Sequence, residues 1–467
     1  MELLTDTICA IATPVGEAGI GIIRLSGPQA LDVARKIFSH KDPGLHLQSH
    51  TLHHGWIVDP DANEPIDEVL LSFMAAPRTY TGEDVVEINC HSGYAVLNRV
   101  LGLVIGSGAR LAQPGEFTRR AFLNGRIDLS QAEAVIDTIR TRSEQGLLLA
   151  NRHLRGDFRQ LVENWLEILE QAQSRLDALL DFCEDIPEET AREPHLYDSL
   201  LEALAVGVKQ PLRAALNRFE EGRVLREGLT FVLVGKPNVG KSSMLNALLG
   251  KERAIVTALP GTTRDVIEDT LLLGGVQVRV FDTAGIRAEP DEIESRGIEM
   301  TIRSLTQADV ALWLLDHGRP ISEEDQSVYE AIAKKPCVVL LNKSDLPPAF
   351  PAQSLNERFP GLGPALSLSA INPSDIEGLK ARLAHSYVRT PVNNCGSQIV
   401  PNTRQKECLE CALDSILTAE ALLRSNSYGE LISFELGSAR QHLEAIVGRA
   451  HDVELLDRIF LQFCVGK

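Results

Sequence analysis

The sequence predicts a multidomain α/β and α protein. An α+β block comes first, and an α/β block with a mostly parallel sheet is inserted into a discontinuous helical domain. Three observations predict this fold class. A strand, a glycine-rich loop and a helix begin near residue 231, later apolar strands end in polar clusters, and helical spacing flanks this region on both sides. The expected domains cover residues 1–120, 121–226, 227–387 and 388–467.

The inserted block opens with a phosphate-loop pattern. Residues 231–234 are apolar and indicate a buried strand, and G-x-x-x-x-G-K-S follows from Gly235 to Ser242. Gly235 and Gly240 permit backbone conformations that turn N–H groups toward a triphosphate. Lys241 is expected to reach the β- and γ-phosphates, and the Ser242 hydroxyl to ligate Mg²⁺. The alternative is an ordinary glycine turn before a core helix.

Polar clusters follow the later strands of this block. They are Asp282-Thr283-Ala284-Gly285, Asn342-Lys343-Ser344-Asp345 and Ser369-Ala370. The carboxyl ends of strands in an open parallel sheet are where such sheets bind ligands. Asp282 is expected to hold Mg²⁺ through water, and the Gly285 N–H to contact the γ-phosphate. Asp345 offers a carboxylate to two N–H donors of a guanine edge, which favours GTP over ATP.

Composition limits the function classes. The chain has 467 residues and a formal net charge of −18, so it is not expected to bind nucleic acid without a local basic patch or a basic partner. The sequence lacks the basic start of a signal peptide and any apolar run of ~18 residues. Its eight cysteines form no framework. These features predict a cytoplasmic protein without a membrane span.

The first block is expected to be α+β, with strands at 21–25, 69–73 and 85–91. Period two in the last strand places Val86, Ile88 and Cys90 on one face and Val85, Glu87, Asn89 and His91 on the other. From the residues alone, Arg24 and Glu87 are interpreted as surface or salt-bridge residues. His91 alone indicates no metal site.

The segments on either side of the inserted block are expected to be helical and to pack on each other. Ser130-Gln131-Ala132-Glu133 predicts a capping box, and apolar residues follow helical spacing from Leu161 to Leu179. An acidic loop is expected at 183–197 and a linker at 390–397. Cys408 and Cys411 are expected to share an apolar helix stripe rather than to hold a metal.

One residue departs from the small signalling GTPases. Ile286 stands where those proteins carry the glutamine that orients the attacking water. With this departure the chain resembles the MnmE (TrmE) family of tRNA-modification GTPases over nearly its whole length. The resemblance is carried by residues 6–27, 81–87 and 114–117, by the GTPase block with Gly261-Thr262-Thr263-Arg264-Asp265, and by Phe463-Cys464-Val465-Gly466-Lys467.

The resemblance implies a homodimer with a folate-binding N-terminal domain, a helical domain and an inserted Ras-like P-loop GTPase domain. It implies K⁺-dependent GTP hydrolysis and a flavin-dependent partner, MnmG, which brings FAD and forms a heterotetramer or larger complex. Together they would add a carboxymethylaminomethyl-type group to C5 of the wobble uridine of certain tRNAs. The one-carbon donor would be a tetrahydrofolate derivative, either 5,10-methylenetetrahydrofolate or 5-formyltetrahydrofolate.

The resemblance also implies roles for individual residues. Mg²⁺ would be held by Ser242 and Thr263, and K⁺ by Asn238, Thr257, Leu259 and Thr262. Glu294 would orient the attacking water. Folate would be bound by Arg24, Glu87, Arg126 and Lys467, and Cys464 would be open to modification chemistry. The implied GTP-binding residues are Asn238, Val239, Gly240, Lys241, Ser242, Ser243, Thr257, Ala258, Leu259, Pro260, Gly261, Thr262, Thr263, Asp282, Thr283, Ala284, Gly285, Asn342, Lys343, Ser344, Asp345, Ser369, Ala370 and Ile371.

Three positions depart from the family pattern: Arg126 replaces a frequent lysine, Val465 an isoleucine and Ala258 an aspartate. Two other functions compete with tRNA modification. One is a regulatory switch GTPase, such as a ribosome-assembly factor, which performs no substrate chemistry. The other is a scaffold with a degenerate nucleotide site. Binding of a tetrahydrofolate would favour tRNA modification over the switch GTPase. Comparing GTP hydrolysis in KCl and in NaCl would distinguish tRNA modification from the scaffold, which is expected to show no turnover in either salt.

Overall fold

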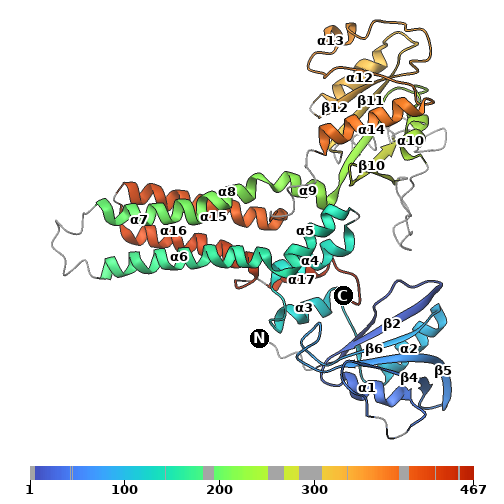
Figure 1. The fold of residues 1–467 in the computed structure, drawn as a ribbon, viewed down its shortest axis with the longest axis vertical. Helices are drawn as coiled ribbons and strands as arrows, with labels where there is room; N and C mark the ends of the chain where they lie inside the picture. The colour runs from blue at the N-terminus through green and yellow to red at the C-terminus, as the bar shows by residue number, and fades with distance from the viewer. Residues whose placement is uncertain are drawn as a thin grey trace. The chain divides into compact units, whose positions relative to one another are not determined.

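The structure is a computed structural model that describes most of the chain (Figure 1). The described residues are 6–42, 44, 46–141, 143–181, 194–250, 268–282, 308–333, 335–388, 399–425, 427–450 and 453–467. The chain forms two compact units. The first contains Met1–Ile139, Asn151–Ala214 and Thr403–Lys467, and the second contains Arg140–Ala150 and Ala215–Asn402.

The first unit begins with a seven-stranded sheet of order β3-β4-β5-β6-β2-β1-β7. Its strands are β1 (Ile8–Ile11), β2 (Ala18–Ser26), β3 (Phe38–Ser39), β4 (Thr51–Asp59), β5 (Glu64–Met74), β6 (Val85–Ser92) and β7 (Arg110–Leu111). The helices α1 (Ala30–Ile37) and α2 (Tyr94–Gly106) pack on one face of this sheet. The α+β prediction for this block is confirmed, and the three predicted strands correspond to β2, β5 and β6.

The two faces of this sheet differ in character. Val86, Ile88 and Cys90 of β6 point into the core with α1 and α2, as the period-two pattern predicts. On the other face, Arg24 pairs in register with Glu87, which is opposite Ser72, while Leu70 is opposite Asn89. The side chains of Leu70 and Trp56 on this second face are 43% and 40% exposed. This face therefore leaves apolar area uncovered beside the Arg24–Glu87 pair.

The helical part of the first unit joins segments from both ends of the chain. Its helices are α3 (Glu116–Leu123), α4 (Leu129–Arg140), α6 (Asp157–Asp181), α7 (Pro194–Leu204), the π-helical turn η1 (Ala205–Lys209), α15 (Thr403–Arg424), α16 (Gly429–Val447) and α17 (Val453–Phe460). Two others, α5 (Glu144–Arg155) and α8 (Gln210–Asn217), span the boundary between the units. The helices α6 and α15 both pack against α16, so segments before and after the inserted block contact each other. No helix in the described ranges is long and apolar enough to cross a membrane.

The predicted capping box at residues 130–133 is wrong by two residues. The Gln131 N–H donates to Asp128 Oδ1 at 3.0 Å, and the Asp128 N–H donates to Gln131 Oε1 at 3.0 Å. The Ser130 hydroxyl donates to the same Asp128 oxygen instead of capping the helix. Asp128 is the better cap because a carboxylate oxygen near a helix N-terminus is a stronger acceptor than a hydroxyl oxygen. Glu133 is free to pair elsewhere.

Two smaller predictions also need correction. Cys408 is half-buried and Cys411 is exposed, because the buried stripe of α15 runs through Leu409, Ala412 and Ile416. The two cysteines therefore do not share an apolar stripe. The acidic loop was expected to reach residue 197, but α7 begins at Pro194, a residue suited to the first helical turn. Residues 182–193 and the expected linker at 390–397 lie outside the described part of the chain.

The second unit is built on a six-stranded sheet of order β13-β12-β11-β8-β10-β9. Its strands are β8 (Leu229–Val234), β9 (Glu268–Leu273), β10 (Val276–Asp282), β11 (Val310–Asp316), β12 (Cys337–Asn342) and β13 (Leu366–Ser367). All pairings are parallel except that of β9 with β10. The helices of this unit are α9 (Phe219–Glu227), α10 (Lys241–Leu249), α12 (Glu323–Ile332), α13 (Ser354–Arg358) and α14 (Pro373–Tyr387).

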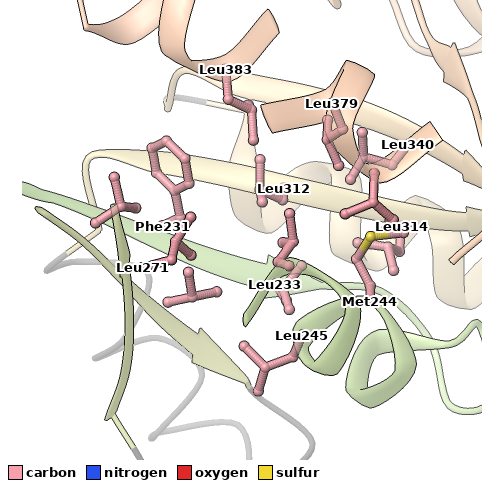
Figure 2. Packing of buried hydrophobic residues seen from close by; sticks show 14 of the residues in the cluster. Phe231, Leu233, Met244, Leu245, Leu271, Leu312, Leu314, Leu340, Leu379 and Leu383 are labelled. Carbon is pink, nitrogen blue, oxygen red and sulfur yellow. The ribbon is translucent and has the colours of Figure 1, made fainter. Parts of the chain in front are cut away.

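Two apolar layers cover the faces of this sheet. On one face, Phe231 and Leu233 of β8 belong to one buried apolar cluster with Met244 of α10 and Leu379 of α14 (Figure 2). On the other face, Trp313 of β11 lies among the residues that pack against α12 and α13. Helices on both faces of a mostly parallel sheet make a doubly covered α/β layer structure. Together with the first unit, this confirms the predicted fold class.

A buried ion pair provides a stability prediction for the first unit. Arg404 donates through Nε and Nη2 to the two Glu133 oxygens at 2.6 and 2.9 Å, and it also caps the last carbonyls of α16. Glu133→Gln leaves the Arg404 charge buried without its counter-charge, which costs on the order of 3 kcal/mol. Urea unfolding followed by circular dichroism should shift to lower urea. The control is Glu163→Gln, because Glu163 pairs with the half-exposed Arg449 and should cost less than about 1 kcal/mol. Equal shifts for the two variants would contradict this role for Arg404 and Glu133.

Candidate functional site

The loop between β8 and α10 is shaped by two glycines. Gly235 and Gly240 have φ angles of 151° and 99°. A Cβ at residue 235 would lie 2.5 Å from the Leu314 carbonyl oxygen, and one at residue 240 would lie 2.4 Å from Asn342 Nδ2. Only glycine fits at either position, because both the backbone conformation and the space exclude a side chain. The loop thus runs directly against the ends of β11 and β12.

Lysine and serine follow this loop at the start of α10. The Lys241 ammonium lies over the loop and donates to the carbonyl oxygens of Gly235 and Lys236 at 2.6 and 3.0 Å. Ser242 and Ser243 occupy the first turn of α10 and are exposed. The positive end of a helix, a cationic side chain and two hydroxyl-bearing residues therefore lie at one end of the loop. This arrangement suits an anion such as a phosphate chain.

The polar cluster after β12 lies beside this loop. Asn342 donates from Nδ2 to the Val239 carbonyl oxygen at 2.8 Å, and its Oδ1 accepts from the Ala370 N–H at 3.0 Å. The Ser369 hydroxyl donates to Asp345 Oδ1 at 2.6 Å and so holds an exposed carboxylate in place. Ile371 follows with 78% exposure. The structure therefore brings the predicted phosphate-binding and base-binding segments to one edge of the sheet.

Several predicted residues lie outside the described part of the chain. They are Thr257, Ala258, Leu259, Pro260, Gly261, Thr262, Thr263, Thr283, Ala284, Gly285 and Glu294. Asp282 is described through its backbone alone: it ends β10 and is in register with Leu233 of β8. That register places Asp282 at the same sheet edge as the phosphate loop.

A second polar site lies in the first unit, where β2 approaches the residues that follow α17. Arg24 of β2 donates from Nε to Glu87 Oε1 at 2.8 Å and from Nη1 to the Gly466 carbonyl oxygen at 2.9 Å. The guanidinium also lies 5.9 Å from the ring centre of Phe117 in α3. A hydrogen-bonded carboxylate and a ring face fix the orientation of this cation. Arg24 and Glu87 therefore form the salt bridge that their residue types indicate.

The last residues of the chain complete this second site. Burial and the charge of Arg24 lower the pKa of the Lys467 ammonium, while Glu87 and Cys464 act in the opposite direction. Cys464 is exposed, and its carbonyl oxygen accepts from the N–H groups of Gly115 and Lys467. Arg126 is exposed just beyond α3, and no hydrogen bond or ion pair within the described ranges joins it to Arg24, Glu87 or Lys467. The structure thus brings together three of the four predicted folate-binding residues.

Sequence reasoning missed two contributors to these sites. Phe117 lies beneath Arg24, and Asp316 at the end of β11 accepts from Lys343 at 2.7 Å. The signal for Asp316 was available, because it is an acidic residue at the carboxyl end of an apolar strand. No local pattern in the sequence places Phe117 against Arg24.

The sheet, the glycine-shaped loop and the lysine and serine that follow it define a P-loop nucleotide-binding protein. Its first unit matches the family models described as "GTP-binding protein TrmE N-terminus" over residues 7–126 and, with the inserted block, "MnmE helical domain" over residues 129–464. The tRNA modification GTPase MnmE of Syntrophobacter fumaroxidans is 55% identical and covers 99% of this chain and 98% of its own length. The protein of that name from Carboxydothermus hydrogenoformans is 44% identical over the whole of both chains. This chain belongs to the MnmE family.

A structural neighbour covers part of the chain. Era from Aquifex aeolicus, in a structure bound to GDP and AlF4⁻, is 25% identical over 40% of this chain and 67% of its own, with a TM-score of 0.27. This TM-score is too low to indicate a shared fold for the whole chain.

The close approach of the C-terminal residues gives a prediction for the second site. Gly466 has φ 96°, and a Cβ there would lie 2.6 Å from the Ile11 carbonyl oxygen. Gly466→Ala should cost about 1–3 kcal/mol and displace the last residues from Arg24. Hydrogen exchange of residues 461–467 should become faster. Gly102→Ala is the control, since nothing lies within 4 Å of that position, and equal exchange in the two variants would show that the tail does not depend on this contact.

Proposed function

We propose that this protein binds and hydrolyses GTP in its second unit and takes part in tRNA modification. The observation that carries the proposal is the convergence of the phosphate loop, Asn342 and Asp345 at one sheet edge. Relatives named tRNA modification GTPase align with essentially all of the chain, and that name supplies the reaction context. A cytoplasmic location fits a protein that acts on tRNA.

The proposed hydrolysis mechanism uses ions in place of protein side chains. Ile286 has no group that can orient water, so Glu294 takes this role through a second water. Ser242 and Thr263 would hold Mg²⁺, and Asn238 with Thr257, Leu259 and Thr262 would hold K⁺. A monovalent cation bound by these residues would supply positive charge that offsets the charge developing during phosphoryl transfer. Asn238 has φ 63°, a conformation that asparagine tolerates better than most residues.

The second site is proposed to bind a tetrahydrofolate derivative as one-carbon donor. Glu87 can hold a pterin edge through both carboxylate oxygens, while Arg24, Lys467 and Arg126 can hold the glutamyl tail. Cys464, beside Lys467, would take part in the modification chemistry. The carboxymethylaminomethyl-type group would be added to C5 of the wobble uridine together with MnmG, whose FAD supplies the redox chemistry. Since this chain carries a net charge of −18, a basic partner surface would help to attract the tRNA.

A homodimer is proposed through the uncovered face of the first sheet. Leu70 and Trp56 are large, apolar and exposed there, in the same sheet face as Arg24 and Glu87. Burying such a patch against a second copy removes apolar area from water. The two folate sites of the dimer would then lie next to the interface.

Hydrolysis in two salts tests the first part of the proposal. GTP turnover should be faster in KCl than in NaCl, and Glu294→Ala should retain GTP binding while losing turnover by about 10²-fold. Glu377→Ala is the control, because Glu377 is an exposed partner of Lys380. Equal turnover in both salts would contradict the K⁺ mechanism, and weakened GTP binding in Glu294→Ala would make Glu294 structural.

Calorimetry with 5-formyltetrahydrofolate tests the second part. The protein should bind it in a stoichiometric amount, and Arg24→Ala or Glu87→Ala should weaken binding at least about tenfold, because each removes a charge-assisted hydrogen bond. Arg35→Ala is the matched control, since Arg35 pairs with Asp32 on the surface. Absence of folate binding to the unaltered protein would instead favour a switch GTPase without substrate chemistry.

A further inference from the structure

Two successive carbonyl groups of the phosphate loop are held from the same side. Lys343 donates from Nζ to the Asn238 carbonyl oxygen at 3.1 Å, and Asn342 donates from Nδ2 to the Val239 carbonyl oxygen at 2.8 Å. Consecutive residues at the end of β12 thus hold consecutive residues of the loop. Lys343 itself has φ 64°, so the backbone turns sharply directly after β12.

Holding these carbonyls also aims two N–H groups. The C=O and N–H of a trans peptide point in opposite directions. Within the described ranges the one cis peptide is Ala76-Pro77, so the peptides after Asn238 and Val239 are trans. With both carbonyls directed toward β12, the N–H groups of Val239 and Gly240 point away from it. A phosphate loop needs its N–H groups turned toward the anion, so the two contacts set the geometry of the cradle.

The two holding side chains differ in how firmly they are themselves fixed. Asn342 is buried, and both ends of its amide are hydrogen-bonded. Lys343 is a long side chain with four rotatable bonds, and an ammonium can swing toward water. Its anchor is Asp316, which is 4% exposed and accepts from Lys343 Nζ at 2.7 Å. The other carboxylate oxygen of Asp316 accepts from the Gly318 N–H at 3.0 Å, so the anchor is fixed in turn.

The protonation state of this anchor is also set by its surroundings. Burial alone would raise the pKa of the Asp316 carboxyl, but the hydrogen bonds from Lys343 and Gly318 outweigh burial and hold that pKa below its usual range. Asp316 is therefore charged at neutral pH. Sheet register keeps it in place, since Asp316 is directly opposite Asn342 in the β11–β12 pair.

We propose that Asp316 is a positioning residue for the nucleotide: it holds Lys343 so that Lys343 fixes the Asn238 carbonyl and thereby aims the phosphate-loop N–H groups. Asp316 touches no nucleotide in this role. The inference rests on the proposed GTP site and adds to it a residue outside the motifs by which that site is recognised. Removing the charge of Asp316 should release the Asn238 carbonyl while Asn342 still holds the Val239 carbonyl.

The test uses the full chain and GDP carrying a fluorescent label on its ribose. Asp316→Asn keeps the side-chain shape and an acceptor for the Gly318 N–H, and it should speed GDP dissociation about tenfold. Arg319→Gln is the matched control, because Arg319 approaches the same carboxylate oxygen at 3.6 Å but its side chain is 61% exposed. The control should dissociate GDP at the rate of the unaltered protein.

A double-mutant cycle separates positioning from a general packing effect. In a Lys343→Met background, Asp316→Asn should change GDP dissociation by less than about twofold. Asp316 acts through the Lys343 ammonium, and this ammonium is absent from the Lys343→Met variant. Hydrogen exchange gives a second measurement that needs no nucleotide. Peptides covering residues 235–240 should exchange faster in Asp316→Asn, while those covering 310–315 should not change.

Three results would overturn the inference: unchanged dissociation and exchange in Asp316→Asn, an undiminished effect of Asp316→Asn in the Lys343→Met background, or faster exchange along all of β11. Failure of the proposed GTP site has a different signature. The unaltered protein would then not bind labelled GDP, and the exchange of residues 235–240 would still report on Asp316.

Discussion

The hydrogen bonds of Asn342 are the constraint on which the geometry of the second unit depends. One buried amide holds the Val239 carbonyl, accepts from the Ala370 N–H, and occupies the space that a side chain at residue 240 would need. The side-chain amide of Asn342 thereby joins three segments: the phosphate loop at Val239, the end of β12, and the segment at Ala370. Its position follows from the β11–β12 register, in which Asp316 is opposite Asn342. A one-residue slip would turn the amide to the other face of the sheet and separate all three segments.

Two lysines near Asn342 are held by buried carboxylates. Lys236, within the phosphate loop, donates at 2.8 Å to Asp325, which also caps α12, and Lys343 donates to Asp316. Each carboxylate is almost fully buried and accepts further N–H groups, so it acts as a rigid point. A lysine held in this way loses little additional side-chain entropy when a ligand binds. The loop is thus braced from α12 on one side and from β11 and β12 on the other.

The sequence alone predicts the parts of this structure that depend on local pattern. Glycine spacing locates the phosphate loop, and strand-end polarity places Asn342, Asp345 and Ser369 at one edge, because parallel strands end together. Predictions fail where two local candidates compete, as when Asp128 rather than Ser130 caps α4. They also fail where tertiary packing decides which face of a helix is buried. Helical spacing alone assigns Cys411 to the buried stripe of α15, but Cys411 is exposed. Edge strand β9 was not predicted, since its antiparallel pairing with β10 leaves no polar cluster at the ligand edge.

The site around Arg24 depends on contacts between residues that are far apart in the sequence. The sequence could therefore predict which residues belong to this site but not how they contact one another. Phe463 is buried among residues of α3, α4 and α17, and Gly466 follows it closely in the sequence. A Cβ at Gly115, which precedes α3, would lie 2.5 Å from the Phe460 carbonyl oxygen, so α3 and the end of α17 are locked together. Phe117 of α3 lies against Arg24, while Gly466 after α17 accepts from it. Glu87 of β6 is the third partner of Arg24, but the other two lie on or next to this helix pair, so a shift of about 1 Å in α17 would break the hydrogen bond of 2.9 Å to Gly466. Packing in the helical core therefore sets the orientation of the Arg24 guanidinium together with Glu87 of the sheet.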